Sequence, residues 1–137
     1  MKFSRRLSLA LIALMLVVAM LALPMTASAE GAFHGRATLD VPADLESPVT
    51  LTVGRISVTI PPGAMPEGGT ISLRVVETPS GRFVAEFLPD LDFEVAVTMD
   101  YATAPWVDYM TKKGPQRMWT ENGKIQSYHF SRYSGWF

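Results

Sequence analysis

Hydrophobic and polar positions alternate with a period of two along four stretches of the chain. The hydrophobic members are Ile56, Val58 and Ile60; Ile71, Leu73 and Val75; Phe83, Ala85 and Phe87; and Phe93, Val95, Val97, Met99 and Tyr101. Successive side chains of a strand point to opposite faces, so each stretch predicts a strand with one buried face. Ala37 to Val41 predicts a further strand, after a loose start over Glu30 to Gly35.

Turns rich in proline and glycine separate these strands. They are Pro61-Pro62-Gly63, Pro66-Glu67-Gly68-Gly69 and Pro79-Ser80-Gly81. Proline has no backbone N–H to donate to a sheet, so each cluster ends the strand before it. Val49 and Leu51 lie before Gly54, and two interpretations stay open for them. They either extend the strand at Ile56 or form its partner across Gly54.

The segment from Ala102 to Pro115 is the least regular. Trp106, Tyr109 and Met110 are spaced i, i+3 and i+4, which is typical of one face of a helix. This spacing predicts a short helix over Trp106 to Lys113.

Asn122-Gly123 lies between two β-rich runs, Arg117 to Thr120 and Ile125 to Tyr133. A type I′ turn needs positive φ at both central residues, so this pair predicts a β-hairpin. The whole pattern predicts an all-β fold, an antiparallel β-sandwich of about seven to nine strands.

The first 29 residues have the order of parts of a secretory signal peptide. These parts are a positive start (Lys2, Arg5, Arg6), an uncharged apolar run (Leu7 to Leu23), Pro24 and a small-x-small site (Ala27-Ser28-Ala29). We therefore expect a cleavable apolar signal helix over residues 1–29 and a single domain over residues 30–137. The apolar run is longer than the usual core of about 7–15 residues, so an uncleaved N-terminal membrane anchor stays open.

Charge and cysteine content narrow the function classes. Three of the 12 basic residues and none of the 13 acidic residues lie in the first 29 positions, so residues 30–137 have a net charge of −4. This balance gives no basic footprint for nucleic acid. The chain has no cysteine, which excludes disulfides, a thiol nucleophile and a lipid-bearing cysteine.

Three motifs carry a resemblance to a known family. Ile56 to Leu73, ISVTIPPGAMPEGGTISL, resembles the opening of the ZU-five domain of ankyrins, netrin receptors and zonula occludens proteins. Leu88 to Tyr101 is similar to a later segment of that family, and Tyr128 to Tyr133 to its closing His-Phe-Ser. The resemblance covers Val49 to Tyr133. It implies a β-sandwich interaction or spacer module, here in a bacterial, exported, stand-alone version.

The resemblance also implies one reaction, at His129-Phe130-Ser131. In some relatives the chain cuts itself between the Phe and the Ser of this motif. Ser131 Oγ would attack the Phe130 carbonyl carbon and replace the amide by an ester that water hydrolyses, with His129 as the base. Cleavage would release Ser131 to Phe137. The same residues also suit a closing strand, which we favour, with Phe130 in the core and His129 and Ser131 facing outward.

Metal and cofactor sites have little support in the sequence. Asp90, Asp92 and Glu94 can offer carboxylates to calcium, but their spacing is also that of a solvated strand face, which we favour. Two histidines, His34 and His129, are too few for a zinc site. We expect no metal and no cofactor.

Aromatic side chains are frequent in the last third of the chain: Trp106, Tyr109, Trp119, Tyr128, Tyr133, Trp136 and Phe137. Several must point into a core, and we expect Trp136 and Phe137 to be exposed. Exposed aromatics on a β-sandwich bind glycans or partner proteins.

The chain contains no glycine-rich phosphate loop and no Ser-His-Asp arrangement. We therefore expect a non-enzymatic, exported module that binds an unidentified protein or glycan. It would be secreted, periplasmic or at the cell surface, and at a membrane only if the signal is uncleaved. A self-cleaving domain processed between Phe130 and Ser131 is the alternative. A chaperone-like or inhibitory module is not distinguished from a binding module.

Overall fold

The computed structural model describes residues 33–137. The predicted signal peptide of residues 1–29 lies outside the described residues. Residues 33–137 form strands and connecting turns, and this part of the chain contains no helix that is long and apolar enough to cross a membrane.

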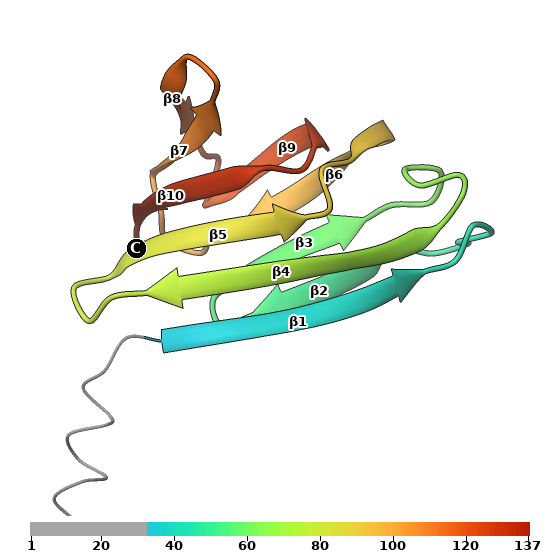
Figure 1. The fold of residues 1–137 in the computed structure, drawn as a ribbon, viewed down its shortest axis with the longest axis horizontal. Coiled ribbons are helices and arrows are strands. Elements are labelled where there is room, and N and C mark those ends of the chain that lie inside the picture. Colours follow the sequence, from blue (N-terminus) through green and yellow to red (C-terminus); the bar gives the residue numbers. More distant parts are fainter. Residues whose placement is uncertain (1–32) are drawn as a thin grey trace, which may run out of the picture. The chain divides into compact units, whose positions relative to one another are not determined.

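Ten strands form two antiparallel sheets in the described part of the chain (Figure 1). One sheet has six strands in the order β1-β4-β5-β10-β7-β8, and the other has four in the order β2-β3-β6-β9. The strands are β1 (Phe33–Val41), β2 (Val49–Val53), β3 (Ile56–Ile60), β4 (Gly69–Glu77), β5 (Arg82–Leu88), β6 (Asp92–Asp100), β7 (Trp106–Thr111), β8 (Gly114–Trp119), β9 (Lys124–His129) and β10 (Arg132–Trp136). The all-β prediction is confirmed, and the predicted seven to nine strands were too few.

The first three strands show where the sheet structure begins and how Val49 and Leu51 are placed. β1 begins at Phe33, so the loose start predicted up to Gly35 was wrong over its last three residues. Val49 and Leu51 lie on β2, which pairs with β3 across a tight turn. Gly54 lies in that turn with φ +59°, a conformation that glycine adopts without steric cost. The partner interpretation is therefore correct.

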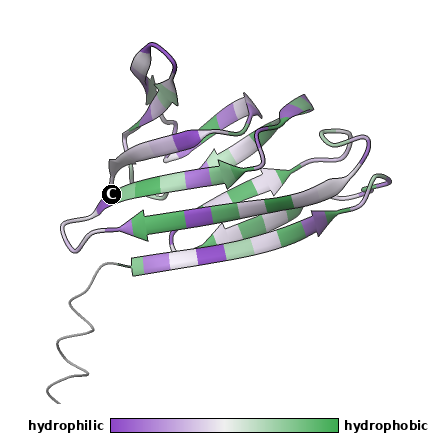
Figure 2. Cartoon of the chain, in the orientation of Figure 1, coloured by the Kyte–Doolittle hydropathy of each residue, from purple (hydrophilic) through white to green (hydrophobic). Residues whose placement is uncertain are grey.

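The core lies between the inner faces of the two sheets. Hydrophobic and hydrophilic positions alternate along β4 and β5 (Figure 2). All of the alternating apolar residues predicted for β3, β4 and β5 are almost fully buried. On β6 the pattern fails at Val95, which is 44% exposed. The strand bulges there, because five steps from Asp92 to Val97 lie opposite only two steps of β9.

The helix predicted over Trp106 to Lys113 was wrong. This segment forms β7, which pairs with β8 on one side and with β10 on the other. Val107 is fully buried and Tyr109 packs against the core, so the segment also has a period-two apolar face. Pairing with two strands satisfies the backbone groups of β7, and this tertiary context outweighs the short helical spacing.

The turn predicted at Asn122-Gly123 is confirmed, but the predicted pairing of the two strands that flank it was wrong. Both residues have positive φ, 52° and 82°, and Glu121 and Lys124 exchange two backbone hydrogen bonds of 3.0 Å. The flanking strands then separate, because β8 pairs with β7 and β9 pairs with β6. The turn therefore links the two sheets instead of closing a two-stranded ribbon.

The run predicted from Ile125 to Tyr133 is likewise divided between the two sheets. β9 ends at His129 in the four-stranded sheet, and β10 begins at Arg132 in the six-stranded sheet. Phe130 and Ser131 form the corner between them, which we call the β9–β10 corner. The predicted closing strand is therefore broken at the residues that carry the candidate reaction.

Candidate functional site

The β9–β10 corner is anchored by the side chain of Phe130, which is 1% exposed. Its ring lies 5.4 Å from that of Phe87 and 4.7 Å from that of Phe93, between centroids. The Phe130 N–H donates to the Leu91 carbonyl at 3.0 Å, and the Phe87 N–H donates to the Ser131 carbonyl at 3.0 Å. The candidate scissile bond thus lies between two residues that are each hydrogen-bonded to other segments. Phe130 occupies the core, as predicted.

His129 ends β9 with its ring turned toward Tyr109, 5.0 Å away between centroids. The Ser127 hydroxyl donates to the His129 carbonyl at 2.9 Å, which fixes the backbone at the end of the strand. The His129 Nε2 atom is buried and has no hydrogen-bond partner among residues 33–137. A buried nitrogen without a partner costs stability. The ring lies on the same side of β9 as buried Ile125 and Ser127, so the outward orientation predicted for His129 was wrong.

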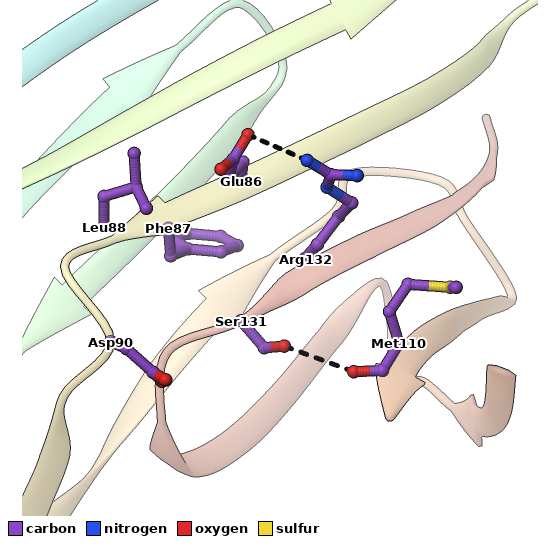
Figure 3. A pocket seen from close by; sticks show the side chains of 7 residues that line it. All are labelled: Glu86, Phe87, Leu88, Asp90, Met110, Ser131 and Arg132. Carbon is purple, nitrogen blue, oxygen red and sulfur yellow. Dashed lines mark hydrogen bonds and ion pairs between the residues drawn. The ribbon is translucent and has the colours of Figure 1, made fainter. Parts of the chain in front are cut away.

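Ser131 lies on the other side of the corner, where it lines an open hollow (Figure 3). Its hydroxyl points to the carbonyl of Met110 at 3.5 Å, a long contact. Within the described part of the chain, no hydrogen bond joins Ser131 to His129. A general base acts from within hydrogen-bond reach of the proton that it removes. The structure therefore brings the two residues to the same corner without forming that bond.

The hollow beside Ser131 has a volume of about 370 Å³. We call it the Ser131 hollow; its lining residues are Glu86, Phe87, Leu88, Asp90, Met110, Ser131 and Arg132 (Figure 3). The Glu86 carboxylate accepts hydrogen bonds from Arg74 at 2.9 Å and from Arg132 at 3.4 Å. The serine therefore lies among both charged side chains (Glu86, Asp90, Arg132) and apolar ones (Phe87, Leu88, Met110).

The acidic residues Asp90, Asp92 and Glu94 are exposed. Residues 33–137 contain no group of three or more His, Cys, Asp or Glu side chains arranged to hold a metal ion. The three carboxylates are therefore not brought together.

The C-terminal aromatics divide between the core and the surface. Tyr133 is fully buried, whereas Trp119, Tyr128 and Trp136 are 73%, 61% and 44% exposed. Trp136 is exposed, as predicted. The prediction for Phe137 was wrong, because its ring packs 4.5 Å from that of Phe83 and its N–H donates to the Gly81 carbonyl.

Trp119 borders a second open hollow, of about 670 Å³. We call it the Trp119 hollow; its lining residues are Thr98, Met118, Trp119, Glu121, Asn122, Lys124, Ile125 and Gln126. Most of these side chains carry hydrogen-bond donors or acceptors. The sequence did not reveal this site, because Thr98 on β6 and Trp119 on β8 meet only when the two sheets assemble.

Tyr101 and Tyr133 are ionisable groups in the core, with ring centroids 5.7 Å apart. Burial, and secondly the neighbouring Tyr133, raises the pKa of Tyr101 well above 10.0. Burial raises the pKa of Tyr133 as well, and its hydrogen bond with Ser127 partly opposes the rise. Both phenols therefore stay protonated at neutral pH and act as packing groups.

The fold and its surfaces define a two-sheet antiparallel β protein with open hollows among the described residues. The chain matches no protein-family model, and it matches no curated protein significantly. The ZU-five resemblance therefore stays a prediction that depends on its three motifs alone.

Proposed function

We propose that the protein is an exported, non-enzymatic β-sandwich module that binds a glycan or a protein outside the cell or at its surface. The observation that supports this proposal is Trp119, whose side chain is 73% exposed at the border of a polar hollow. A large exposed aromatic costs solubility and is typical of a binding surface.

The chemistry of the Trp119 hollow favours a glycan as the first ligand class to test. An indole offers a flat apolar face for a sugar ring, and neighbouring polar side chains hydrogen-bond to hydroxyl groups. Asn122 and Gln126 each offer an amide donor and acceptor, and Thr98 offers a hydroxyl. These groups suit a ligand that is neutral and rich in hydroxyls.

The experiment is a retention assay of residues 30–137 on immobilised cellulose, chitin and starch. Trp119→Ala is expected to lose about tenfold in affinity for the retained polysaccharide, because it removes the stacking surface. The control is Tyr128→Ala, which removes an exposed aromatic of β9, in the other sheet, that does not line the hollow. Equal losses in both variants, or no retention of the wild type, would contradict a glycan at this hollow.

Export depends on residues 1–29 and has its own test. We propose cleavage after Ala29, with an N-terminal anchor as the outcome if cleavage fails. N-terminal sequencing of protein recovered from the medium or the periplasm is expected to start at Glu30. A chain that stays in the membrane fraction with Met1 intact would contradict cleavage.

Self-cleavage between Phe130 and Ser131 is the second candidate. It is favoured by the position of the bond, at a corner between two sheets with the Ser131 side chain in an open hollow. β10 lies between β5 and β7, so Ser131 to Phe137 would stay bound after cleavage rather than leave as a free tail. Intact mass under denaturing conditions is the measurement. A species ending at Phe130 that disappears in Ser131→Ala is the expected result, and its absence from the wild type excludes the reaction.

A further inference from the structure

The register of the six-stranded sheet places three arginines in one line across four strands. Arg36 on β1 is opposite Arg74 on β4, Arg74 is opposite Glu86 on β5, and Glu86 is opposite Arg132 on β10. All four alternate with inward-facing residues of their strands, so they lie on the outer face of the sheet. We call Arg36, Arg74, Glu86 and Arg132 the arginine row.

The arginine row has a charge opposite to that of the chain. Three arginines and one glutamate give it a net charge of +2, whereas the whole chain has −1. Arg74 and Arg132 both bond to the Oε2 atom of Glu86, at 2.9 and 3.4 Å. Arg36 forms no ion pair with any of the described residues. The one carboxylate of the row is therefore shared by two of its three guanidinium groups, and Arg36 is left without an ion pair among the described residues.

The pairing of Arg36 with Arg74 is not explained by folding. Like charges directly opposite each other on neighbouring strands reduce the stability of a sheet. Both side chains are exposed and line a further hollow of about 230 Å³ together with His34 and Val76. An anion between the two guanidinium groups would remove the repulsion.

We propose that the outer face of the six-stranded sheet binds a carboxylate-bearing polysaccharide along the arginine row. This surface is separate from the Trp119 hollow, so the two proposals can fail independently. The row supplies the charge, and Trp136, 6.0 Å from the guanidinium of Arg82 on the same sheet, supplies an aromatic face.

The ion pairs of Glu86 are an example, within the same sheet, of a carboxylate bound by two arginines. Its carboxylate already lies between two arginines that are two strands apart. The guanidinium group is a planar fork that matches a carboxylate, and every cation of the row is arginine rather than lysine. A ligand carboxylate would lie above the sheet between Arg36 and Arg74, which are opposite each other on neighbouring strands.

The shape of the face favours an extended ligand over a single ion. The row crosses three strand spacings, roughly 14 Å at the usual separation of neighbouring strands. One end borders the hollow at Arg36 and Arg74, and the other borders the Ser131 hollow at Arg132. A chain lying along the row would therefore contact both hollows.

The test is isothermal titration of residues 30–137 with polygalacturonate, with neutral pullulan as the comparison. Arg36→Gln combined with Arg132→Gln is expected to bind polygalacturonate about tenfold more weakly, because two exposed ion pairs are lost. The matched control is Lys112→Gln combined with Lys113→Gln at the exposed β7–β8 turn, which removes the same charge. Equal losses in the two double variants would overturn the proposal.

Two single variants sharpen the result. Asp90→Asn removes a negative charge from the Ser131 hollow and is expected to tighten binding about twofold. Arg36→Gln is expected to weaken binding while it raises the melting temperature of the free protein by about 2 °C, because the repulsion of Arg74 is relieved. A lower melting temperature with unchanged binding would show that Arg36 is structural and would overturn the proposal.

Other polyanions serve as competing probes. Vesicles of phosphatidylcholine with phosphatidylglycerol, and a single-stranded oligonucleotide, are titrated at the same concentration of negative charge. Weaker binding of both, together with a loss of polygalacturonate binding at high salt, supports the proposal. Tighter binding of either probe, or no binding of polygalacturonate at low salt, overturns it. Trp119→Ala is expected to leave the polygalacturonate affinity unchanged.

Discussion

Gly123 and Gly114 both have positive φ, 82° and 110°, yet their surroundings differ. A Cβ atom on Gly123 would collide with the backbone of Ala102, whereas a Cβ on Gly114 would meet no atom within 4 Å. Gly114→Ala therefore costs only the backbone strain, about 1 kcal/mol. Gly123→Ala must also displace the backbone at Ala102, and we expect a loss of about 3 kcal/mol or more.

Urea unfolding of the two variants measures this difference directly. Equal losses would show that the chain at Ala102 moves aside without cost. Side-chain volume is matched between the two substitutions, so the comparison isolates the close approach.

At the scale of single residues, the sequence predicted burial where the alternation was regular. Phe83, Phe87 and Phe130 were assigned to the core, and all three are buried. Val95 and Phe137 were assigned wrongly. A bulge on β6 turns Val95 outward, and a hydrogen bond to Gly81 folds Phe137 onto Phe83. Neither the bulge on β6 nor the contacts of Phe137 can be predicted from the neighbouring residues in the sequence.

At the scale of elements, the β9–β10 corner depends on one side chain. Phe130 packs against Phe87 of one sheet and Phe93 of the other, so its ring joins the sheets where the chain crosses between them. Phe130→Ala is expected to cost about 3–5 kcal/mol, the range for deleting a buried aromatic. Tyr128→Ala, two positions earlier and exposed, is expected to change the stability by less than about 0.5 kcal/mol.

Thermal unfolding followed by circular dichroism compares the two variants. A small effect of Phe130→Ala would show that the corner is held by its backbone hydrogen bonds to Leu91 and Phe87 rather than by the ring. This variant also tests whether the candidate scissile bond is positioned by packing.

The sequence identified most strands but not their partners. The alternation of β3 to β6 and the Asn122-Gly123 turn are local features, and each was predicted correctly in kind. Partner choice is not local, since β1 pairs with β4, β5 with β10 and β6 with β9. The helix expected at β7 failed for the same reason, because the strand is stabilised by a neighbour from the far end of the chain.

At the scale of the whole molecule, two buried tyrosines set the alkaline limit of stability. Below pH 10.0 both phenols are neutral in the folded and the unfolded chain, and they add no pH dependence. Above it the unfolded chain ionises first, because burial raises the pKa of Tyr101 and Tyr133 in the folded state. Stability is therefore expected to fall as the pH rises above 10.0, toward the raised folded values.

Melting temperatures measured on both sides of pH 10.0 test this dependence. Tyr101→Phe removes the tyrosine whose pKa is raised well above the usual value, so its melting temperature should decline less steeply above pH 10.0. An identical decline in the variant and the wild type would assign the effect to other groups. The variant also loses the hydrogen bond from the Tyr101 hydroxyl to Met99 Sδ, so the comparison is made between slopes rather than absolute values.

The candidate sites were the least predictable feature of the whole molecule. His129, Phe130 and Ser131 were found from a motif, but the hollow beside Ser131 takes residues from three separate strands and from two connections. The arginine row has no sequence signature at all, because its members are far apart in the chain and meet only through the register of four strands.

The place of β10 has a consequence for how the protein is made. β10 is the last strand in chain order, yet it lies inside its sheet and joins β5 to β7. A nascent chain that has not yet reached Trp136 lacks the strand that closes the six-stranded sheet. Folding must therefore wait until synthesis has passed that point. Until then the facing edges of β5 and β7 lack their partner, and unpaired strand edges are prone to associate with other chains.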